Sequence, residues 1–133
     1  MTRINANIPP AELCDSHLLA EHREITRVAN TIKSGRAIIK DIPRKFTLGT
    51  GHVKFFYNKV RFIQNRYDSL YDECIARGFN IESKHNSFED IPINLFRDWE
   101  PTEEANLIIR QRIKERLLSM KNIKYTSHER KKI

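Results

Sequence analysis

The residues with the clearest chemical potential lie near the N-terminus. Glu24 is flanked by Arg23 and Arg27, and His17 lies two helical turns before it. A carboxylate at the edge of an apolar surface can be partly desolvated, which raises its pKa and suits proton transfer, whereas nearby guanidinium groups lower the pKa and can hold phosphates. The alternative is an ordinary surface ion pair between Glu24 and Arg27, which would stabilise a helix only slightly.

The motifs of several common enzyme classes are missing. The sequence contains no GxSxG, no P-loop, no paired Cys and His and no zinc-ligand spacing, so neither a metal site nor a nucleotide cofactor is expected. Cys14 and Cys74 are far apart in the chain, and no apolar N-terminal stretch resembles a signal peptide. No run approaches 18 apolar residues, which argues against a membrane span. We therefore expect a reduced, cytoplasmic protein.

The charge balance indicates a polyanionic partner. The chain has 133 residues with 24 Lys and Arg against 17 Asp and Glu, which gives a net charge of +7. Nucleic acid is the first candidate for such a surplus, and a membrane surface is the second. The basic residues are spread along the chain and become denser in a tail over residues 121–133.

Apolar periodicity predicts an all-α, compact single domain over residues 1–133. Positions spaced by three and four predict three main helices, over residues 16–33, 52–77 and 101–120. No segment alternates with period two, so no sheet is expected. Residues 1–15, with Pro9 and Pro10, are predicted to form an extended arm that crosses the helical body.

A helical wheel of the first helix places His17 and Glu24 at the rim of the buried face, with Arg23 and Arg27 just beyond them. Glu21 falls inside the apolar arc and needs a partner, for which a buried ion pair with an arginine is the ordinary explanation. Arg112 and Arg116, one turn apart on the third helix, could form a phosphate clamp or an ordinary solvated face. Trp99 is expected to fill the core.

Five stretches in order resemble the phage pyrimidine-dimer DNA glycosylase/AP lyase family, of the phage endonuclease V type. They are MTRIN, HLLAEHREITRV, FTLGTGHVKFFYNK, ARGFNI and PTEEANLIIRQRIKER, and the resemblance runs from Met1 to about residue 120. The resemblance implies a DNA repair enzyme that needs no metal or other cofactor and acts, as a monomer, on double-stranded DNA with a damaged or abasic site. If the gene is carried by a phage, the place of action is the host cytoplasm.

The resemblance also assigns roles to individual residues. In this family the initiator Met is removed, and the α-amine of the next residue, here Thr2, forms a Schiff base with the sugar, after which β-elimination cuts the strand. An α-amine has a pKa of about 7.7 to 8.0, so a useful fraction is free base at neutral pH. Glu24 matches the catalytic glutamate, with Arg23 and Arg27 as its flanking arginines. The positions matching DNA contacts are Arg3, His17, Arg112, Arg116, Lys121, Lys124 and Tyr125.

Two departures from the family pattern leave alternatives open. The arm before His17 is one residue longer than usual, and the tail KNIKYTSHERKKI keeps only Lys124 and Tyr125 of an aromatic tail that helps to recognise the lesion. One alternative is therefore an enzyme that cleaves mainly at abasic sites or excises another modified base. The other, from a different class, is a basic helical module that binds DNA without chemistry.

Overall fold

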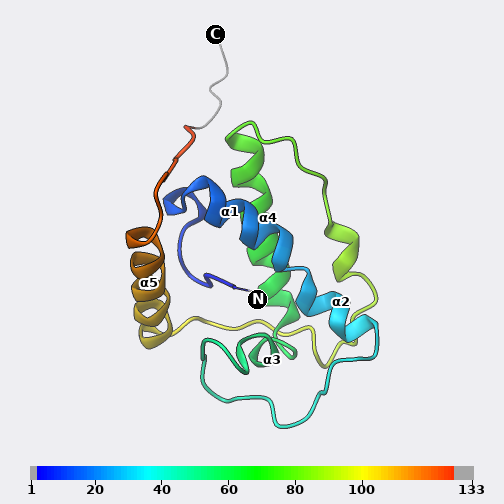
Figure 1. Cartoon of the computed structure of the whole chain (residues 1–133). Helices are drawn as coiled ribbons and strands as arrows, with labels where there is room; N and C mark the ends of the chain where they lie inside the picture. The colour runs from blue at the N-terminus through cyan, green and yellow to red at the C-terminus, as the bar shows by residue number, and fades with distance from the viewer. Residues whose placement is uncertain (1–2, 128–133) are drawn as a thin grey trace.

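The computed structural model of the chain describes residues 3–127, which are helical and contain no strand, as the sequence predicted (Figure 1). In chain order the elements are a 3₁₀ turn η1 (Pro10–Glu12), helices α1 (Asp15–Glu24), α2 (Arg27–Lys33), α3 (His52–Phe55) and α4 (Val60–Ala76), a second 3₁₀ turn η2 (His85–Phe88), and helix α5 (Glu103–Leu118). No helix in this range is long and apolar enough to cross a membrane.

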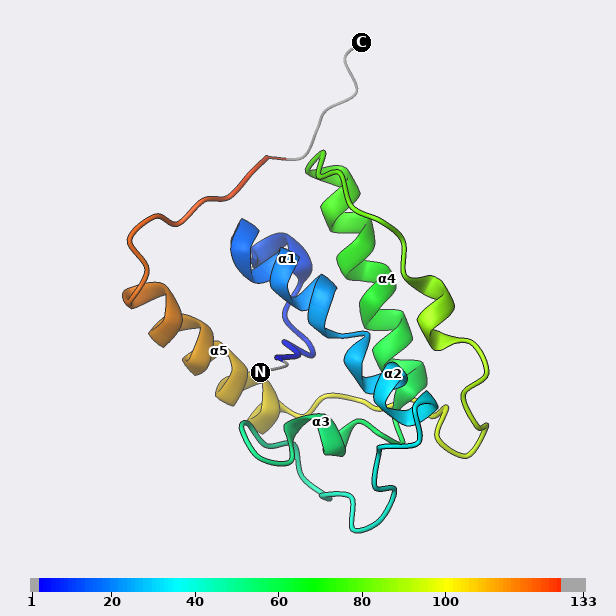
Figure 2. The same cartoon turned by 45° about the vertical axis from the view of Figure 1, so that its right-hand side comes forward.

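Helix α4 is the centre of the core. Five of its side chains, spaced by three and four residues, have no exposed surface: Val60, Ile63, Tyr67, Leu70 and Cys74. Burying each large apolar side chain of this kind stabilises the fold by roughly 1.5–3 kcal/mol. Helix α1 packs against α4, and α5 stands apart from this pair in both views (Figures 1 and 2).

The predicted helix over residues 16–33 was wrong in one respect, because the chain forms two helices joined at Ile25 and Thr26. The Thr26 hydroxyl donates to the Arg23 carbonyl oxygen at 3.3 Å. Such a side-chain bond competes with the regular backbone ladder and is a common cause of helix bends. Arg27 therefore starts a separate helix, and the helical wheel that predicted its position relative to Glu24 does not apply to it.

The predicted helix over residues 52–77 is also interrupted, between α3 and α4. The Lys59 side chain donates to the Phe55 carbonyl oxygen at 3.0 Å and lies over the Phe55 ring, which satisfies the end of α3. The first amide of α4, on Val60, donates to the carbonyl oxygen of Leu95 from a distant loop. Hydrogen bonds from outside the helix therefore replace those that a continuous helix would make.

The break allows several aromatic rings to form one cluster. Trp99 lies within 5.1 to 6.1 Å, centroid to centroid, of four phenylalanine rings: Phe46, Phe55, Phe56 and Phe62. Trp99 is half-buried and packs against the core, as expected for a residue that fills it. The cluster fixes the loop before α3 and the start of α4 to the segment before α5.

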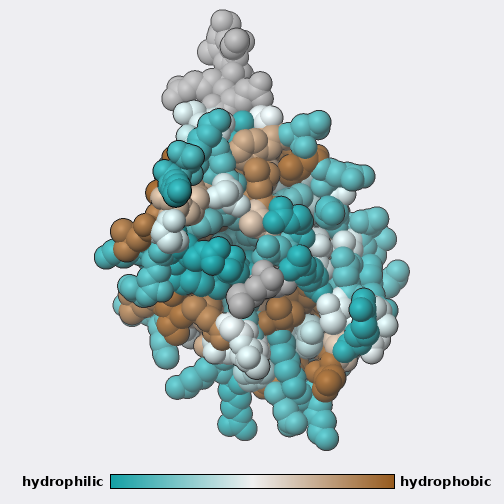
Figure 3. All heavy atoms as spheres, viewed as in Figure 1, coloured by the Kyte–Doolittle hydropathy of each residue, from teal (hydrophilic) through white to brown (hydrophobic). Residues whose placement is uncertain are grey.

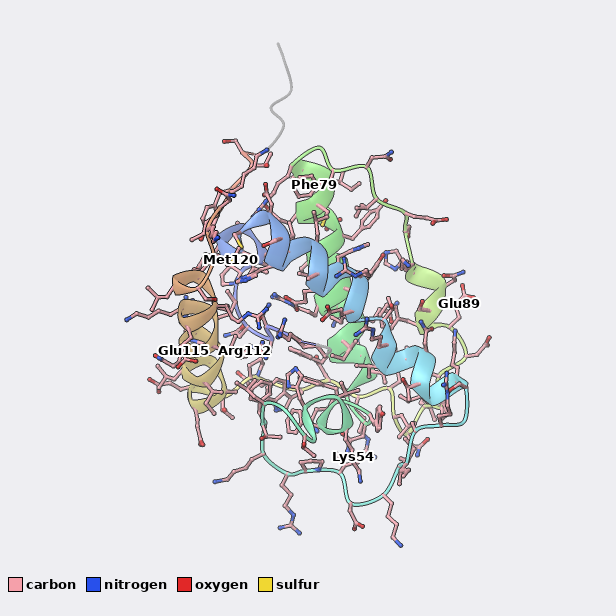
Figure 4. All side chains as sticks on the ribbon, in the orientation of Figure 1. Lys54, Phe79, Glu89, Arg112, Glu115 and Met120 are labelled. Carbon is pink, nitrogen blue, oxygen red and sulfur yellow. The ribbon has the colours of Figure 1, made fainter. Side chains whose placement is uncertain are left out.

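Helix α5 begins at Glu103, two residues after the predicted start at Pro101, and ends at Leu118, two residues before Met120. The Thr102 hydroxyl caps it by accepting from the Ala105 amide at 3.0 Å. Only Ala105 and Ile109 are fully buried on this helix. The half-buried Arg112 follows Ile109 by three residues, on the side of α5 that faces the rest of the molecule (Figure 4).

The described part of the N-terminal arm, residues 3–14, passes between α5 and the pair formed by α1 and α4 (Figures 1 and 2). It is less extended than expected, because it contains a turn closed by the Ile8 amide on the Asn5 carbonyl oxygen, followed by η1. Ile4, Ile8 and Leu13 are at most 2% exposed. This arm is therefore part of the core from Ile4 onward.

Candidate functional site

A small pocket lies where the N-terminal arm, α1 and α5 meet. Its volume is about 30 Å³, which is room for about one or two water molecules. The residues that line it are Arg3, Asn5, His17, Ala20, Glu21, Glu24, Arg112, Ile113 and Arg116. Any large ligand must therefore bind at the mouth of the pocket and extend only a small group into it.

Glu24 is the last residue of α1 and lines this pocket. It is 8% exposed, and its Oε1 accepts a hydrogen bond from the backbone amide of Arg3 at 3.2 Å. Its Oε2 lies 3.7 Å from Nη2 of Arg23, whose own side chain is 63% exposed. The prediction that Glu24 lies at the rim of the buried face agrees with this position. A partly desolvated carboxylate thus meets the backbone of the N-terminal arm.

A buried network holds that arm in register with α1 and α4. Glu21 accepts two hydrogen bonds from Arg66 at 2.9 Å each, so its predicted arginine partner is confirmed as Arg66. The Asn5 amide and side chain also donate to Glu21, at 3.1 and 2.9 Å. Asn5 Oδ1 in turn accepts from Nη2 of Arg112 at 2.7 Å. The network connects α4, α1, the arm and α5 through side chains of these four residues.

Sequence reasoning missed Asn5 and Arg66 as part of this site. Asn5 follows the arm's only arginine in a segment without periodicity, and a single asparagine there carries no signal. Arg66 is one of 24 basic residues, and on α4 it lies next to the buried Tyr67. Only the unpaired Glu21 in the apolar arc indicated that such a partner must exist.

The pocket is electropositive. Burial lowers the pKa of His17, and the nearby charges of Arg116, Arg3 and Arg112 lower it further, so this imidazole is neutral at pH 7. Burial together with the charge of Arg3 lowers the pKa of Arg112 to about 10, which still leaves it protonated. Three guanidinium groups that repel one another beside a neutral His17 favour an anionic ligand, and phosphate is the natural complement of arginine.

His52 is hydrogen-bonded to the N-terminal arm, and it was not among the site residues predicted from the sequence. Its Nδ1 lies 2.8 Å from the Thr47 carbonyl oxygen, to which it must donate, and its Nε2 accepts from the Ile4 amide at 2.9 Å. The bond from the Ile4 amide requires the neutral ring, because a protonated ring has no nitrogen that can accept. Burial accordingly lowers the pKa of His52 to about 4.

We expect the stability of the protein to fall as the pH drops from about 6.5 to about 4. His52 binds a proton readily only in the unfolded chain in this range, so acid favours unfolding by up to about 3 kcal/mol. Urea unfolding at several pH values measures this slope for the wild type and for His52→Gln, which keeps an acceptor for Ile4 but cannot titrate. The exposed Asn86 provides the control Asn86→Gln, which removes no titratable group and should keep the wild-type slope.

Parallel stability curves for the wild type and His52→Gln would contradict this account. Comparison with the variant is needed because burial also lowers the pKa of His22. The difference between the two curves isolates the contribution of His52.

The remaining predicted site residues lie outside the pocket or outside the described range. Arg27 is exposed at the start of α2. Lys121, Lys124 and Tyr125 are exposed on the segment after α5 and do not line the pocket. Thr2, the predicted nucleophile, precedes the first described residue. The pocket thus brings together Arg3, His17, Glu24, Arg112 and Arg116.

The segment after α5 is attached to the start of α1 rather than to the pocket. Asp15 accepts from both the amide and the hydroxyl of Thr126, and the Asp15 amide donates to the Lys124 carbonyl oxygen at 2.8 Å. Arg77 holds Asp15 from the other side at 2.8 Å. Hydrogen bonds to Thr126 and Arg77 lower the pKa of Asp15, although burial opposes them, so this attachment is intact at neutral pH.

A comparison with known protein families matches the first two thirds of the chain. The family model described as pyrimidine dimer DNA glycosylase matches residues 1–87. The matched range contains the arm, Glu24 and His17, and also the network partners Glu21 and Arg66. It ends before α5, so Arg112 and Arg116 lie beyond it.

Proposed function

Because the chain belongs to the pyrimidine dimer DNA glycosylase family, we propose that it excises cyclobutane pyrimidine dimers from duplex DNA and then cuts the strand as an AP lyase. In this proposal the α-amine of Thr2, exposed after removal of Met1, is the nucleophile and Glu24 is the acid/base group. The enzyme acts as a monomer without metal or other cofactor.

One observation carries the proposal: the backbone nitrogen of Arg3 lies 3.2 Å from Glu24 Oε1. This nitrogen is bonded to the residue that would carry the nucleophile. Covalent geometry limits an α-amine one residue earlier to roughly 4 Å from it. A chain that begins at residue 2 therefore has its amine within about 7 Å of the carboxylate, close enough for both to act on one sugar, whereas a retained Met1 would move the amine away.

The proposed reaction has two stages. The amine lone pair of Thr2 attacks C1′ of the sugar, the bond from C1′ to the base breaks, and the base leaves with that electron pair. Opening of the C1′–O4′ bond, with a proton delivered to O4′, leaves an iminium between C1′ and Thr2. Removal of a C2′ proton by Glu24 then expels the 3′ phosphate by β-elimination, and water finally hydrolyses the imine to free the enzyme.

The charges around the pocket support this chemistry. Glu24 faces the sugar carbon where positive charge develops, and a buried carboxylate stabilises such a charge. Arg3, Arg112 and Arg116 line the same pocket, and in this proposal they hold the phosphates on either side of the sugar. In this proposal the exposed Arg23 and Arg27 bind the backbone along α1 and α2, and His17 contacts it as a neutral hydrogen-bonding group.

The segment after α5 is assigned a weaker role. We include Lys121, Lys124 and Tyr125 among the DNA contacts because they are exposed and Asp15 fixes their segment to α1. Tyr125 is 52% exposed and is the only aromatic residue between Lys121 and the end of the chain. Because a single aromatic ring offers little surface for recognising a damaged base, the second candidate function is that of an enzyme that acts mainly at abasic sites.

Borohydride trapping tests the mechanism. We expect protein that begins at Thr2, verified by mass, to form a reduced covalent adduct with a dimer-containing duplex and with an abasic duplex, because borohydride reduces the imine. Peptide mapping should place the adduct on Thr2. The matched control is the same protein with an acetylated N-terminus, which should form no adduct and still fold.

The three remaining outcomes are informative. An adduct with the abasic duplex alone would favour the second candidate. An adduct that maps to a lysine would refute Thr2 as the nucleophile. No adduct with either duplex would leave a protein that binds DNA without chemistry.

A further inference from the structure

Much of the excess positive charge lies in one internal segment away from the pocket. Residues 33–54 contain six Lys and Arg and a single Asp, so 22 residues carry +5 of the chain's net charge of +7. The middle of this stretch, residues 36–45, has no regular secondary structure and is called the basic loop here. Its four cations are Arg36, Lys40, Arg44 and Lys45, and all are exposed.

These cations have no acidic partner. None of the four forms a salt bridge within the described residues. Among the described residues, the one side-chain hydrogen bond that any of them makes joins Arg36 to the hydroxyl of Ser34 at 3.3 Å. The backbone N–H groups of residues 37–45, of which Pro43 has none, also make no hydrogen bond within the described range. The basic loop is therefore rich in donors and positive charge that are left to solvent or to a ligand.

The loop is nevertheless anchored at both ends. On one side Lys33 donates to the Asn86 carbonyl oxygen, and the Ser34 hydroxyl donates to the Thr31 carbonyl oxygen at the end of α2. On the other side Phe46 is 8% exposed in the aromatic cluster around Trp99. A loop held in this way presents its charges in a limited region, which lowers the cost of ordering it on a ligand.

Helix α5 connects the basic loop to the pocket, so the distance between them can be given along this helix. Arg44 and Lys45 share a cavity of about 130 Å³ with Thr102 and Ala105 at the N-terminal end of that helix. Arg112 and Arg116 of the pocket lie seven and eleven residues further along the same helix, a distance of roughly 10 to 16 Å at 1.5 Å per residue. Glu104 also lines this cavity but forms no salt bridge with either cation.

The figures show the same arrangement. The loop runs below α3, between α2 and the start of α5, in both ribbon views (Figures 1 and 2). Long hydrophilic side chains project from the lower edge of the molecule in Figure 3, and Lys54 of α3 lies directly above the loop in Figure 4. The charged edge thus extends away from the pocket rather than around it.

We propose that the basic loop is a second DNA-binding surface, which holds the backbone of the duplex on one flank of the lesion. The proposal rests on the proposed function, since it takes the duplex at the pocket as given. At about 3.4 Å per nucleotide along a strand, the distance along α5 corresponds to roughly three to five base pairs from the lesion. The loop binds phosphates without reading sequence, because its groups are cations and free amides.

The test is the salt dependence of binding to a 25-base-pair duplex with a reduced abasic site at its centre. We compare the wild type with a loop variant in which glutamine replaces all four cations: Arg36→Gln, Lys40→Gln, Arg44→Gln and Lys45→Gln. Each lost phosphate contact lowers the slope of log K against log salt by about 0.9, so we expect the slope to fall by about 3 to 4. At 0.1 M salt the affinity should fall on the order of 10³-fold.

A charge-matched control separates a local contact from a general effect of net charge. It replaces four exposed cations outside the loop: Arg61→Gln, Lys84→Gln, Arg97→Gln and Lys114→Gln. We expect its slope to change by less than about 1. An equal change in the control and the loop variant would overturn the proposal. Melting followed by circular dichroism checks that each variant is folded.

Duplex length gives a second readout. Shortening one flank of the duplex to two base pairs should remove the difference in affinity between the wild type and the loop variant, whereas shortening the other flank should preserve it. A difference that survives both truncations would overturn the proposal.

A membrane surface is the competing ligand, because Ile38 and Ile39 are 68% and 43% exposed within the loop. If the loop variant kept the wild-type salt slope on DNA but lost sedimentation with vesicles containing one quarter phosphatidylserine, the loop would bind lipid and the proposal would be wrong. Failure of the lesion chemistry is distinguishable: a wild type that forms no borohydride adduct but keeps the loop-dependent slope refutes the lyase, not the loop.

Discussion

Glu24→Gln is expected to slow strand cleavage at an abasic site by about 10² to 10⁴-fold while leaving the affinity for the DNA within about threefold. Glutamine keeps an oxygen that can accept the Arg3 amide, so the arm should stay in place. It cannot remove the C2′ proton, and it offers no negative charge to the cationic sugar. Single-turnover cleavage, with binding measured separately on a reduced abasic duplex, gives both quantities.

A matched variant controls for the change in net charge. Glu12→Gln also removes one negative charge, from an exposed ion pair with Arg110, and lies on the arm outside the pocket. It should cleave at close to the wild-type rate. If Glu24→Gln cleaved as fast as Glu12→Gln, Glu24 would not be the acid/base group.

Borohydride trapping with Glu24→Gln divides its role further. If the adduct forms at a normal rate and only strand cleavage is slow, Glu24 acts mainly in β-elimination. If the adduct itself forms slowly on a dimer-containing duplex, Glu24 also assists departure of the base.

Arg66→Met is expected to lower the free energy of unfolding by about 3–5 kcal/mol. The side chains of Arg66 and Glu21 are 5% and 1% exposed, and methionine would leave the Glu21 carboxylate buried without its cation. Urea unfolding at pH 7 measures the loss. Arg61→Met, an exposed position on the same helix, is the matched control and should stay within about 0.5 kcal/mol of the wild type.

The double variant Glu21→Gln/Arg66→Met tests the cause of this loss. Because it removes both charges, it should be more stable than Arg66→Met alone. A double variant that is less stable than the single one would show that packing or the hydrogen bonds to Asn5, rather than an uncompensated charge, dominate at this position.

The sequence predicted the helical class and the main apolar stripe correctly because both depend on local periodicity. On α4 the apolar positions spaced by three and four residues, from Val60 to Cys74, are all buried. The predicted helices were wrong at two breaks, one at a local side-chain hydrogen bond of Thr26 and one at a contact of Val60 with a distant loop. Neither the hydrogen bond from Thr26 to Arg23 nor the one from Val60 to Leu95 can be recognised from the hydrophobic pattern.

The candidate site divides in the same way. The wheel position of Glu24 and the need of Glu21 for a partner follow from one helix, so they could be predicted. Asn5, His52 and Arg66 contribute through bonds that span 16 to 48 residues of sequence, and their residue types alone indicate nothing. Arg3, Arg112 and Arg116 come together only in the tertiary structure, so only the family resemblance predicted that all three belong to one site.

The bond between Asn5 and Arg112 joins positions 107 residues apart, and it has a consequence for synthesis on the ribosome. The arm leaves the ribosome well before α5, yet its place between α1, α4 and α5 exists only after α5 has emerged. Until then Ile4 and Ile8 have no complete core to enter, and Glu24 has no fixed neighbour. Residues 3–14 are thus positioned only after a helix about a hundred residues further along the chain has been made.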